Sequence, residues 1–124
     1  MKPLNALSAK TLLERIDNAA NAELRSVTVL GAVTMQLRMS VQDRNRGFDW
    51  IDLVFEVEGV EDARLVDDTK LAYVDTDEGI SLIFEGGNVG FGVGSYATVE
   101  AVRSAPLYMI GRSIKFAEAP FWES

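Results

Sequence analysis

The chain of 124 residues contains no histidine and no cysteine. Without cysteine it has no disulfide framework, no thiolate nucleophile and no zinc site built on cysteine. Without histidine it lacks the commonest general base and the usual orienting partner of a serine nucleophile. Any acid–base chemistry would depend mainly on carboxylates, so we expect a non-catalytic protein without a cofactor.

Long apolar runs are missing as well. Lys10, Glu14 and Arg15 interrupt the N-terminal segment before it reaches secretory length. The longest stretch without charge, residues 86–99, is too short and too rich in glycine to cross a bilayer, which takes about 20 apolar residues. We therefore expect a soluble protein with no membrane partner, and the cytoplasm as its default location.

The residues that are present have the composition of a globular protein, with 48% hydrophobic and 25% charged side chains. We predict a single domain over 1–124 with an α+β fold. One N-terminal helix, about 9–20, would pack on a mainly antiparallel sheet, a small sandwich or a partly open barrel of about six to nine strands. The β-rich part would span 24–117, followed by an aromatic tail at 118–124.

Helical spacing supports the N-terminal element. Leu12, Leu13 and Ile16 recur on one side of a helix, and Ser8 is a candidate N-cap.

A first hairpin is indicated by two runs of alternating apolar and polar residues, at 33–41 and 50–58. Folding the chain about Asn45 pairs Leu37 with Leu53 and makes every inward pair apolar.

A second hairpin is indicated by the glycine pair 86–87 between the runs 80–85 and 88–94. A tight turn there pairs residues whose numbers sum to 173 and brings Gly90 and Gly92 to one side of the sheet.

Gly90 and Gly92 leave a strip of bare backbone. Either the N-terminal helix or an aromatic such as Trp122 packs on this strip, or the strip forms a shallow binding groove.

Other elements are less strongly marked. We expect strands at 24–31, 60–66, 71–74, 107–110 and 114–116, the last two separated by a turn at Gly111 and Arg112, and either a strand or a short helix capped by Ser95 at 96–103.

The net charge of −7 is concentrated in one segment. Residues 49–85 hold twelve acidic and two basic residues, a net charge of −10, whereas the rest of the chain is net +3. Such asymmetry repels nucleic acid and favours a basic protein partner. Asp67 and Asp68 are candidate binding residues in this segment, and solvated acidic strand faces are the alternative reading.

Trp50, Asp52 and Glu56 share one face of a predicted strand. An aromatic ring flanked by two carboxylates could bind a sugar or, with the right separation, hydrolyse it. The predicted register places Asp52 opposite Arg38, so a surface ion pair explains this carboxylate as well.

Asp75 and Asp77 precede Gly79 with the alternate spacing of oxygen ligands in a calcium loop. The third ligand and the distal glutamate of that loop are missing, and an acidic turn gives the same pattern.

These observations predict a small interaction module that binds a basic protein through 49–85, in the manner of an inhibitor or immunity protein. A small-molecule or carbohydrate-binding domain and a carboxylate hydrolase are the alternatives. A homodimer formed through a strand edge or the terminal aromatics is compatible with each.

Overall fold

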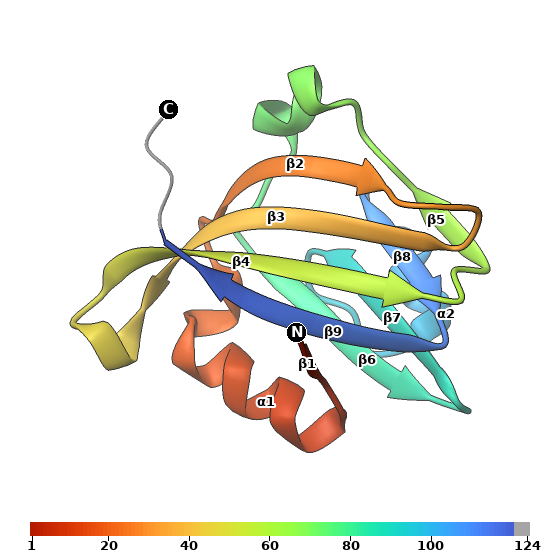
Figure 1. The fold of residues 1–124 in the computed structure, drawn as a ribbon, viewed down its shortest axis with the longest axis horizontal. Coiled ribbons are helices and arrows are strands. Elements are labelled where there is room, and N and C mark those ends of the chain that lie inside the picture. The colour runs from red at the N-terminus through yellow and green to blue at the C-terminus, as the bar shows by residue number, and fades with distance from the viewer. Residues whose placement is uncertain (121–124) are drawn as a thin grey trace.

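The computed structural model of the protein describes residues 1–120 (Figure 1). The fold is α+β, with an N-terminal helix and two antiparallel sheets, as the sequence predicts. The elements are β1 (Lys2–Pro3), α1 (Ala6–Arg15), η1 (Asp17–Ala19), β2 (Glu23–Val29), β3 (Thr34–Asp43), η2 (Arg44–Arg46), β4 (Asp49–Glu58), β5 (Asp62–Arg64), η3 (Asp68–Tyr73), β6 (Ile80–Glu85), β7 (Asn88–Val93), α2 (Val99–Val102), β8 (Tyr108–Gly111) and β9 (Ser113–Ala119). The aromatic pair of the predicted tail, Phe121 and Trp122, lies outside the described residues.

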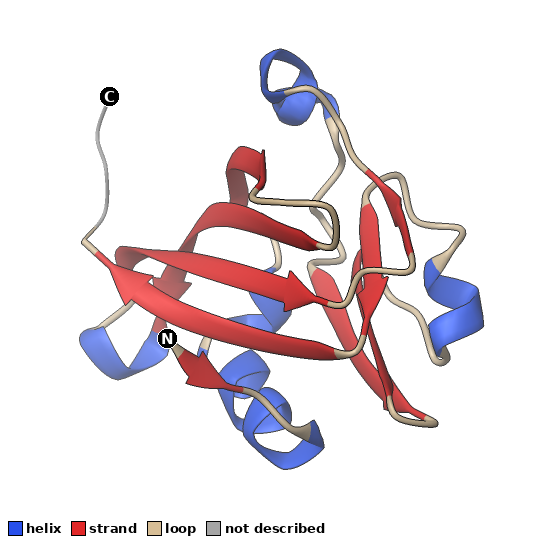
Figure 2. Cartoon of the chain, turned by 45° about the vertical axis from the view of Figure 1, so that its right-hand side comes forward, coloured by secondary structure: helices blue, strands red, loops and turns tan. Residues whose placement is uncertain are grey.

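The two sheets pack face to face (Figures 1 and 2). Sheet A has five strands in the order β1-β9-β4-β3-β2, and sheet B has four in the order β5-β8-β7-β6. Fully buried side chains fill the space between the sheets, and the rings of Phe55 from β4 and Phe91 from β7 lie 5.4 Å apart. Burial of these apolar faces is the main force that holds the two sheets together.

Two elements lie beside the outermost strands of the sheets. Helix α1 contacts β6 at one edge of sheet B, and η3 contacts β2 at one edge of sheet A. The N-terminal helix therefore lies against the sandwich as predicted. Among the described helices, none has the length and apolar character that a membrane span requires.

The bounds of the N-terminal helix differ from the predicted 9–20. The N-cap is Asn5, whose side chain accepts from the Ser8 N–H (2.8 Å) while the Ser8 hydroxyl accepts from the Asn5 N–H (2.9 Å). This reciprocal pair is a capping box, so Ser8 lies within the first turn. The helix ends early because 17–19 have positive φ angles of 52–59° and form the separate turn η1.

The first hairpin forms, but its predicted register is wrong by two residues. Leu37 pairs with Phe55 and not with Leu53. The centre of the connection lies one residue further along the chain, because the Asp43 carbonyl accepts from the Phe48 N–H (2.8 Å) and closes a longer loop. A shift of two residues keeps the same side chains inward.

The second hairpin, β6 and β7, has the predicted register, with Leu82 opposite Phe91. Gly90 and Gly92 face α2, and a Cβ added at Gly92 would lie 3.0 Å from Val102 Cγ1. The predicted contact of this strip with the N-terminal helix is therefore wrong, because a different helix packs on it.

The weaker predictions have mixed outcomes. Strands overlap the predicted ranges 24–31 (β2) and 60–66 (β5), and the helical alternative holds at 96–103, where α2 is capped by Thr98 instead of Ser95. The strand expected at 71–74 is wrong, since these residues belong to η3 and its C-cap. The two strands expected at 107–110 and 114–116 form as β8 and β9, and the break between them takes the chain from one sheet to the other.

Candidate interaction surface

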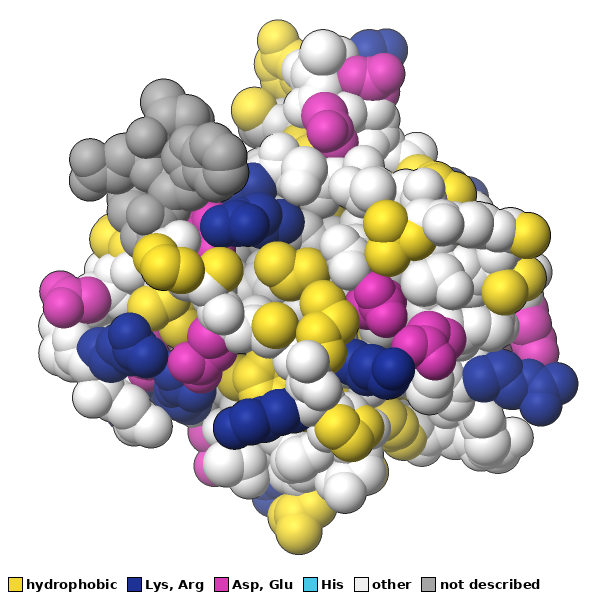
Figure 3. Space-filling model, viewed as in Figure 1, with side chains coloured by type: hydrophobic (Ala, Val, Ile, Leu, Met, Phe, Trp, Pro, Cys, Tyr) yellow, Lys and Arg dark blue, Asp and Glu magenta, His cyan; other side chains and the backbone are white. Residues whose placement is uncertain are grey.

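Most of the acidic side chains in the first half of 49–85 form an ion pair with a basic side chain from another segment. The ion pairs are Asp52 with Arg38, Glu58 with Lys115, Glu61 with Arg112 and Asp62 with Arg103. Figure 3 shows acidic and basic side chains next to each other over the strands of sheet A. Folding therefore neutralises much of the charge that the sequence concentrates in this half.

The pair of Glu58 and Lys115 shows the effect on ionisation. Lys115 Nζ lies 2.7 Å from Glu58 Oε1 on adjacent strands. Hydrogen bonding and charge attraction lower the pKa of Glu58 and raise the pKa of Lys115, so both groups stay ionised at neutral pH.

The second half of the acidic segment keeps its charge. Its exposed carboxylates form no ion pair among residues 1–120. They are Asp67, Asp68, Asp75, Asp77, Glu78 and, at the end of β6, Glu85. The acidic surface is thus narrower than 49–85 and is centred on η3 and the turn that follows it.

Asp52 is buried, whereas the sequence predicted an exposed ion pair. Its Oδ2 lies 2.7 Å from Arg38 Nε, as the predicted partner requires, and its Oδ1 accepts from the Ser40 hydroxyl (2.5 Å). The same hydroxyl accepts from Arg25 Nε (2.8 Å). Ser40 and Asp52 are both fully buried, so this carboxylate is a structural member of a polar network.

Trp50 and Glu56 lie on the same outer face of sheet A. Glu56 accepts from Gln36 Nε2 (2.7 Å) on β3, and 37% of Trp50 is exposed at the opposite end of the β4 face. Sugar binding at Trp50 stays a prediction.

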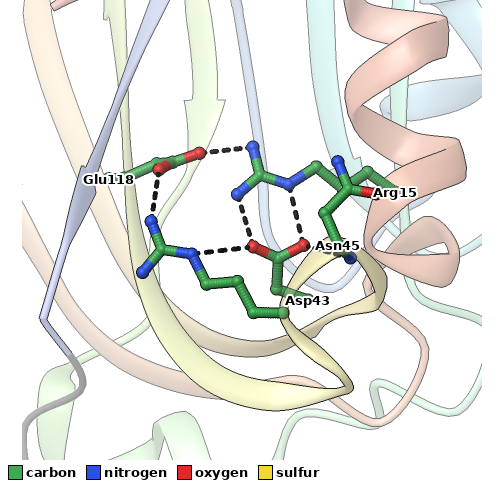
Figure 4. A network of polar contacts seen from close by, with 5 residues as sticks. Arg15, Asp43, Asn45 and Glu118 are labelled. Atoms are coloured by element: carbon green, nitrogen blue, oxygen red, sulfur yellow. Dashed lines mark hydrogen bonds and ion pairs between the residues drawn. The ribbon is translucent and has the colours of Figure 1, made fainter.

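A polar network that the sequence analysis missed anchors the first hairpin (Figure 4). Arg15, at the end of α1, donates through Nε to Asp43 Oδ1 (2.8 Å) and through Nη2 to Oδ2 (2.5 Å). Arg15 also pairs with Glu118 of β9, and Arg46 approaches Asp43 and Glu118 at 3.4 and 3.5 Å. The bidentate Arg15 contact lowers the pKa of Asp43, which is fully buried and stays ionised.

One signal in the sequence points to this network. Asp43 continues the inward positions of β3 after Met39 and Val41, so an acid there requires a cationic partner. Nothing local identifies Arg15, which is 28 residues away in the sequence.

Asp75 and Asp77 form a turn. The Asp75 carboxylate accepts from the Asp77 N–H (2.8 Å), and both residues are exposed. Within residues 1–120, no three acidic side chains converge on a point that could hold a metal ion.

Asp67 and Asp68 lie at an open groove of about 550 Å³. Its lining consists of Val27 and Val29 from β2, of Leu65, Val66 and Asp67 from the segment between β5 and η3, and of Asp68 at the start of η3. Four apolar side chains thus form the walls, and two carboxylates lie beside them.

Both carboxylates are fixed by local hydrogen bonds. Asp68 Oδ1 accepts from the Val27 N–H (2.8 Å), which ties η3 to β2. Asp67 caps η3 by accepting from the N–H and the hydroxyl of Thr69 (2.9 and 2.7 Å). These two donors lower the pKa of Asp67, so the groove carries a negative charge at neutral pH.

Comparisons with protein families, curated proteins and solved structures find no match to this chain. Of the predicted site residues, the structure brings only Asp67 and Asp68 to this groove; Trp50, Asp52 and Glu56 lie on the outer face of sheet A, and Gly90 and Gly92 lie beneath α2.

Proposed function

We propose that this protein is a non-catalytic interaction module that binds a basic protein partner at the groove between β2 and η3. The observation that carries the proposal is the joint presence there of apolar walls and of two carboxylates that form no ion pair among residues 1–120. A partner that presents lysine or arginine beside apolar side chains would complement both features.

The distribution of charge supports this choice of surface. Most of the acids from Asp52 to Asp62 form ion pairs within the fold, such as Glu58 with Lys115, whereas Asp67 and Asp68 are exposed and form no ion pair among residues 1–120. Unpaired surface charge steers association and makes it dependent on ionic strength.

The carboxylates that suggested catalysis have other roles. Asp52 already accepts hydrogen bonds from Arg38 and Ser40, and Glu56 from Gln36. Their present partners favour binding over hydrolysis as the function of the chain.

The test uses substitutions that remove charge and preserve local structure. In the double variant Asp67→Asn, Asp68→Asn, the amide oxygens can still accept from Thr69 and Val27, because asparagine caps as well as aspartate does. A control, Glu14→Gln with Asp49→Asn, changes the net charge equally at exposed positions away from the groove.

Partners captured from host extract by the wild-type protein are purified. Their affinity for the wild-type protein, the groove variant and the control is then measured by titration at low and at high salt. We expect binding that weakens with salt, that the groove variant loses and that the control keeps. Binding that is independent of salt, or that both variants retain, would contradict the proposal.

A further inference from the structure

Strand β2 is an outermost strand, so one side of its backbone faces away from sheet A. The hydrogen bond from the Leu30 N–H to the Thr34 carbonyl (2.9 Å) establishes which residues face β3. Leu30 therefore faces β3. The backbone N–H and C=O groups of successive residues in a strand point to opposite sides, so those of Val29 and Val27 point away from β3. Among residues 1–120, the Val27 N–H is bonded to Asp68 and the Val29 groups have no hydrogen-bond partner.

The side chains around this free edge are also exposed. Val29 is 57% exposed, Leu30 52% and Val33 50%, and all three belong to the connection between β2 and β3 or lie next to it. An open strand edge with exposed apolar side chains is a surface that most proteins protect. Here Asp68 occupies one donor, and the edge beyond Val27 stays open towards the groove.

We propose that the basic partner binds as an extended strand that pairs with β2 at Val29 and enlarges sheet A. This inference rests on the proposed function and specifies how the groove is used. Backbone pairing would satisfy the Val29 N–H and C=O, and alternate side chains of the partner would point into and out of the groove.

The charge of the groove selects the kind of strand. Partner side chains that point into the groove would contact the apolar Leu65 and Val66. Lysine or arginine side chains next to them in the partner would pair with Asp67 and Asp68. The occupant is therefore an extended segment in which apolar and basic residues alternate.

The experiment uses a short blocked peptide of alternating lysine and valine, and a second peptide with N-methyl groups on alternate residues. The methyl groups remove backbone donors and retain every side chain and charge. On the protein, Val29→Pro removes the outward N–H without affecting the hydrogen bonds to β3, and Val29→Thr is the matched control with a β-branched side chain.

We expect the unmodified peptide to bind and to slow hydrogen exchange of the Val29 amide. N-methylation or Val29→Pro should weaken binding by about tenfold or more, the effect of losing a well-formed hydrogen bond, and Val29→Thr should leave it unchanged. Retained circular dichroism of Val29→Pro verifies that the variant is folded.

The other outcomes separate the two proposals. Binding that responds to Asp67→Asn, Asp68→Asn but not to N-methylation or Val29→Pro would overturn strand addition and leave the proposed function in place. Absence of binding at millimolar peptide would overturn both. A dimer of the free protein that Val29→Pro dissociates would identify a second copy of the chain as the occupant and overturn the basic partner.

Discussion

At the tip of the β3–β4 hairpin, Gly47 and Phe48 both have left-handed backbone, with φ angles of 65° and 67°. Glycine adopts this conformation freely, but a phenylalanine does so at a cost of roughly 1–2 kcal/mol. The Phe48 side chain is 57% exposed, so burial of its ring offsets little of this cost.

We therefore expect Phe48→Gly to raise the free energy of unfolding by about 1 kcal/mol, less the entropy that glycine gains in the unfolded chain. Urea denaturation measures the change. Phe48→Ala is the control, because it removes the ring and keeps the strained Cβ, and it should give no gain. Equal stabilisation by both variants would show that the exposed ring, and not the backbone, is responsible.

The buried carboxylate of Asp43 gives a second prediction at the scale of single residues. Asp43→Asn leaves Arg15 facing a neutral amide and should lower the free energy of unfolding by about 2–3 kcal/mol. We place the cost below that of a fully buried pair because the Arg15 side chain is 21% exposed. Asp49→Asn, at an exposed position opposite Asp43 in the hairpin, should change stability little.

The same carboxylate makes stability depend on pH. Its pKa is lower in the folded protein than in the unfolded chain, so its contribution is complete above the unfolded value of about 4. That contribution is lost as the pH falls from about 4 through the folded pKa. The difference in unfolding free energy between wild type and Asp43→Asn should therefore shrink below pH 4; a constant difference would contradict the ionised pair.

The two hairpins show what the pattern of single residues determines at the scale of elements. The alternation of apolar and polar residues determines which side chains of a strand point inward, and this division is predicted correctly in both hairpins. Register depends on the turn: the glycine pair 86–87 specifies a two-residue turn, and the register of β6 and β7 is confirmed. The loop after Asp43 has no such signature. A shift of the β3–β4 register by two residues keeps every side chain on the same face, so the alternating pattern cannot distinguish the two registers.

The candidate groove was predictable only in part for a similar reason. Asp67 and Asp68 were identified from the charge of their segment, but Val27 and Val29 join them only through the tertiary fold. The strand expected at 71–74 failed because Asp67 caps a helical turn in which Leu71 alone is buried. Capping by a side chain competes with strand formation at such a position.

The contact of α2 with β7 gives a prediction at the scale of elements. In Gly92→Ala, the new Cβ would lie 3.0 Å from Val102 Cγ1 and 3.4 Å from Ala105 Cβ. We expect a loss of stability of about 1–2 kcal/mol from overpacking, and partial recovery in Gly92→Ala, Val102→Ala. Gly31→Ala is the control, because nothing lies within 4 Å of its added Cβ. Additive effects of the two substitutions in the double variant would refute the contact.

At the scale of the whole molecule, the chain passes twice between the sheets at one corner. One passage leads from β4 to β5 and the other from β8 to β9. The Arg112 N–H donates to the Glu58 carbonyl (2.9 Å) across the two passages. Gly111 lies next to this contact, and a Cβ added there would be 2.7 Å from Val57 Cγ1 and 2.8 Å from the Glu58 carbonyl oxygen.

Gly111→Ala should therefore destabilise the protein more than Gly92→Ala does, by about 3 kcal/mol or more, because backbone as well as a side chain must move. Thermal unfolding by circular dichroism measures the loss. Gly111→Ala, Val57→Ala removes the side-chain conflict but not the conflict with the carbonyl oxygen, and Val57→Ala alone supplies the cost of the cavity. If the double variant is as stable as Val57→Ala alone, the conflict with the Val57 side chain accounts for the whole loss of stability. If the double variant is less stable, the close approach of the two backbones itself requires glycine at this corner.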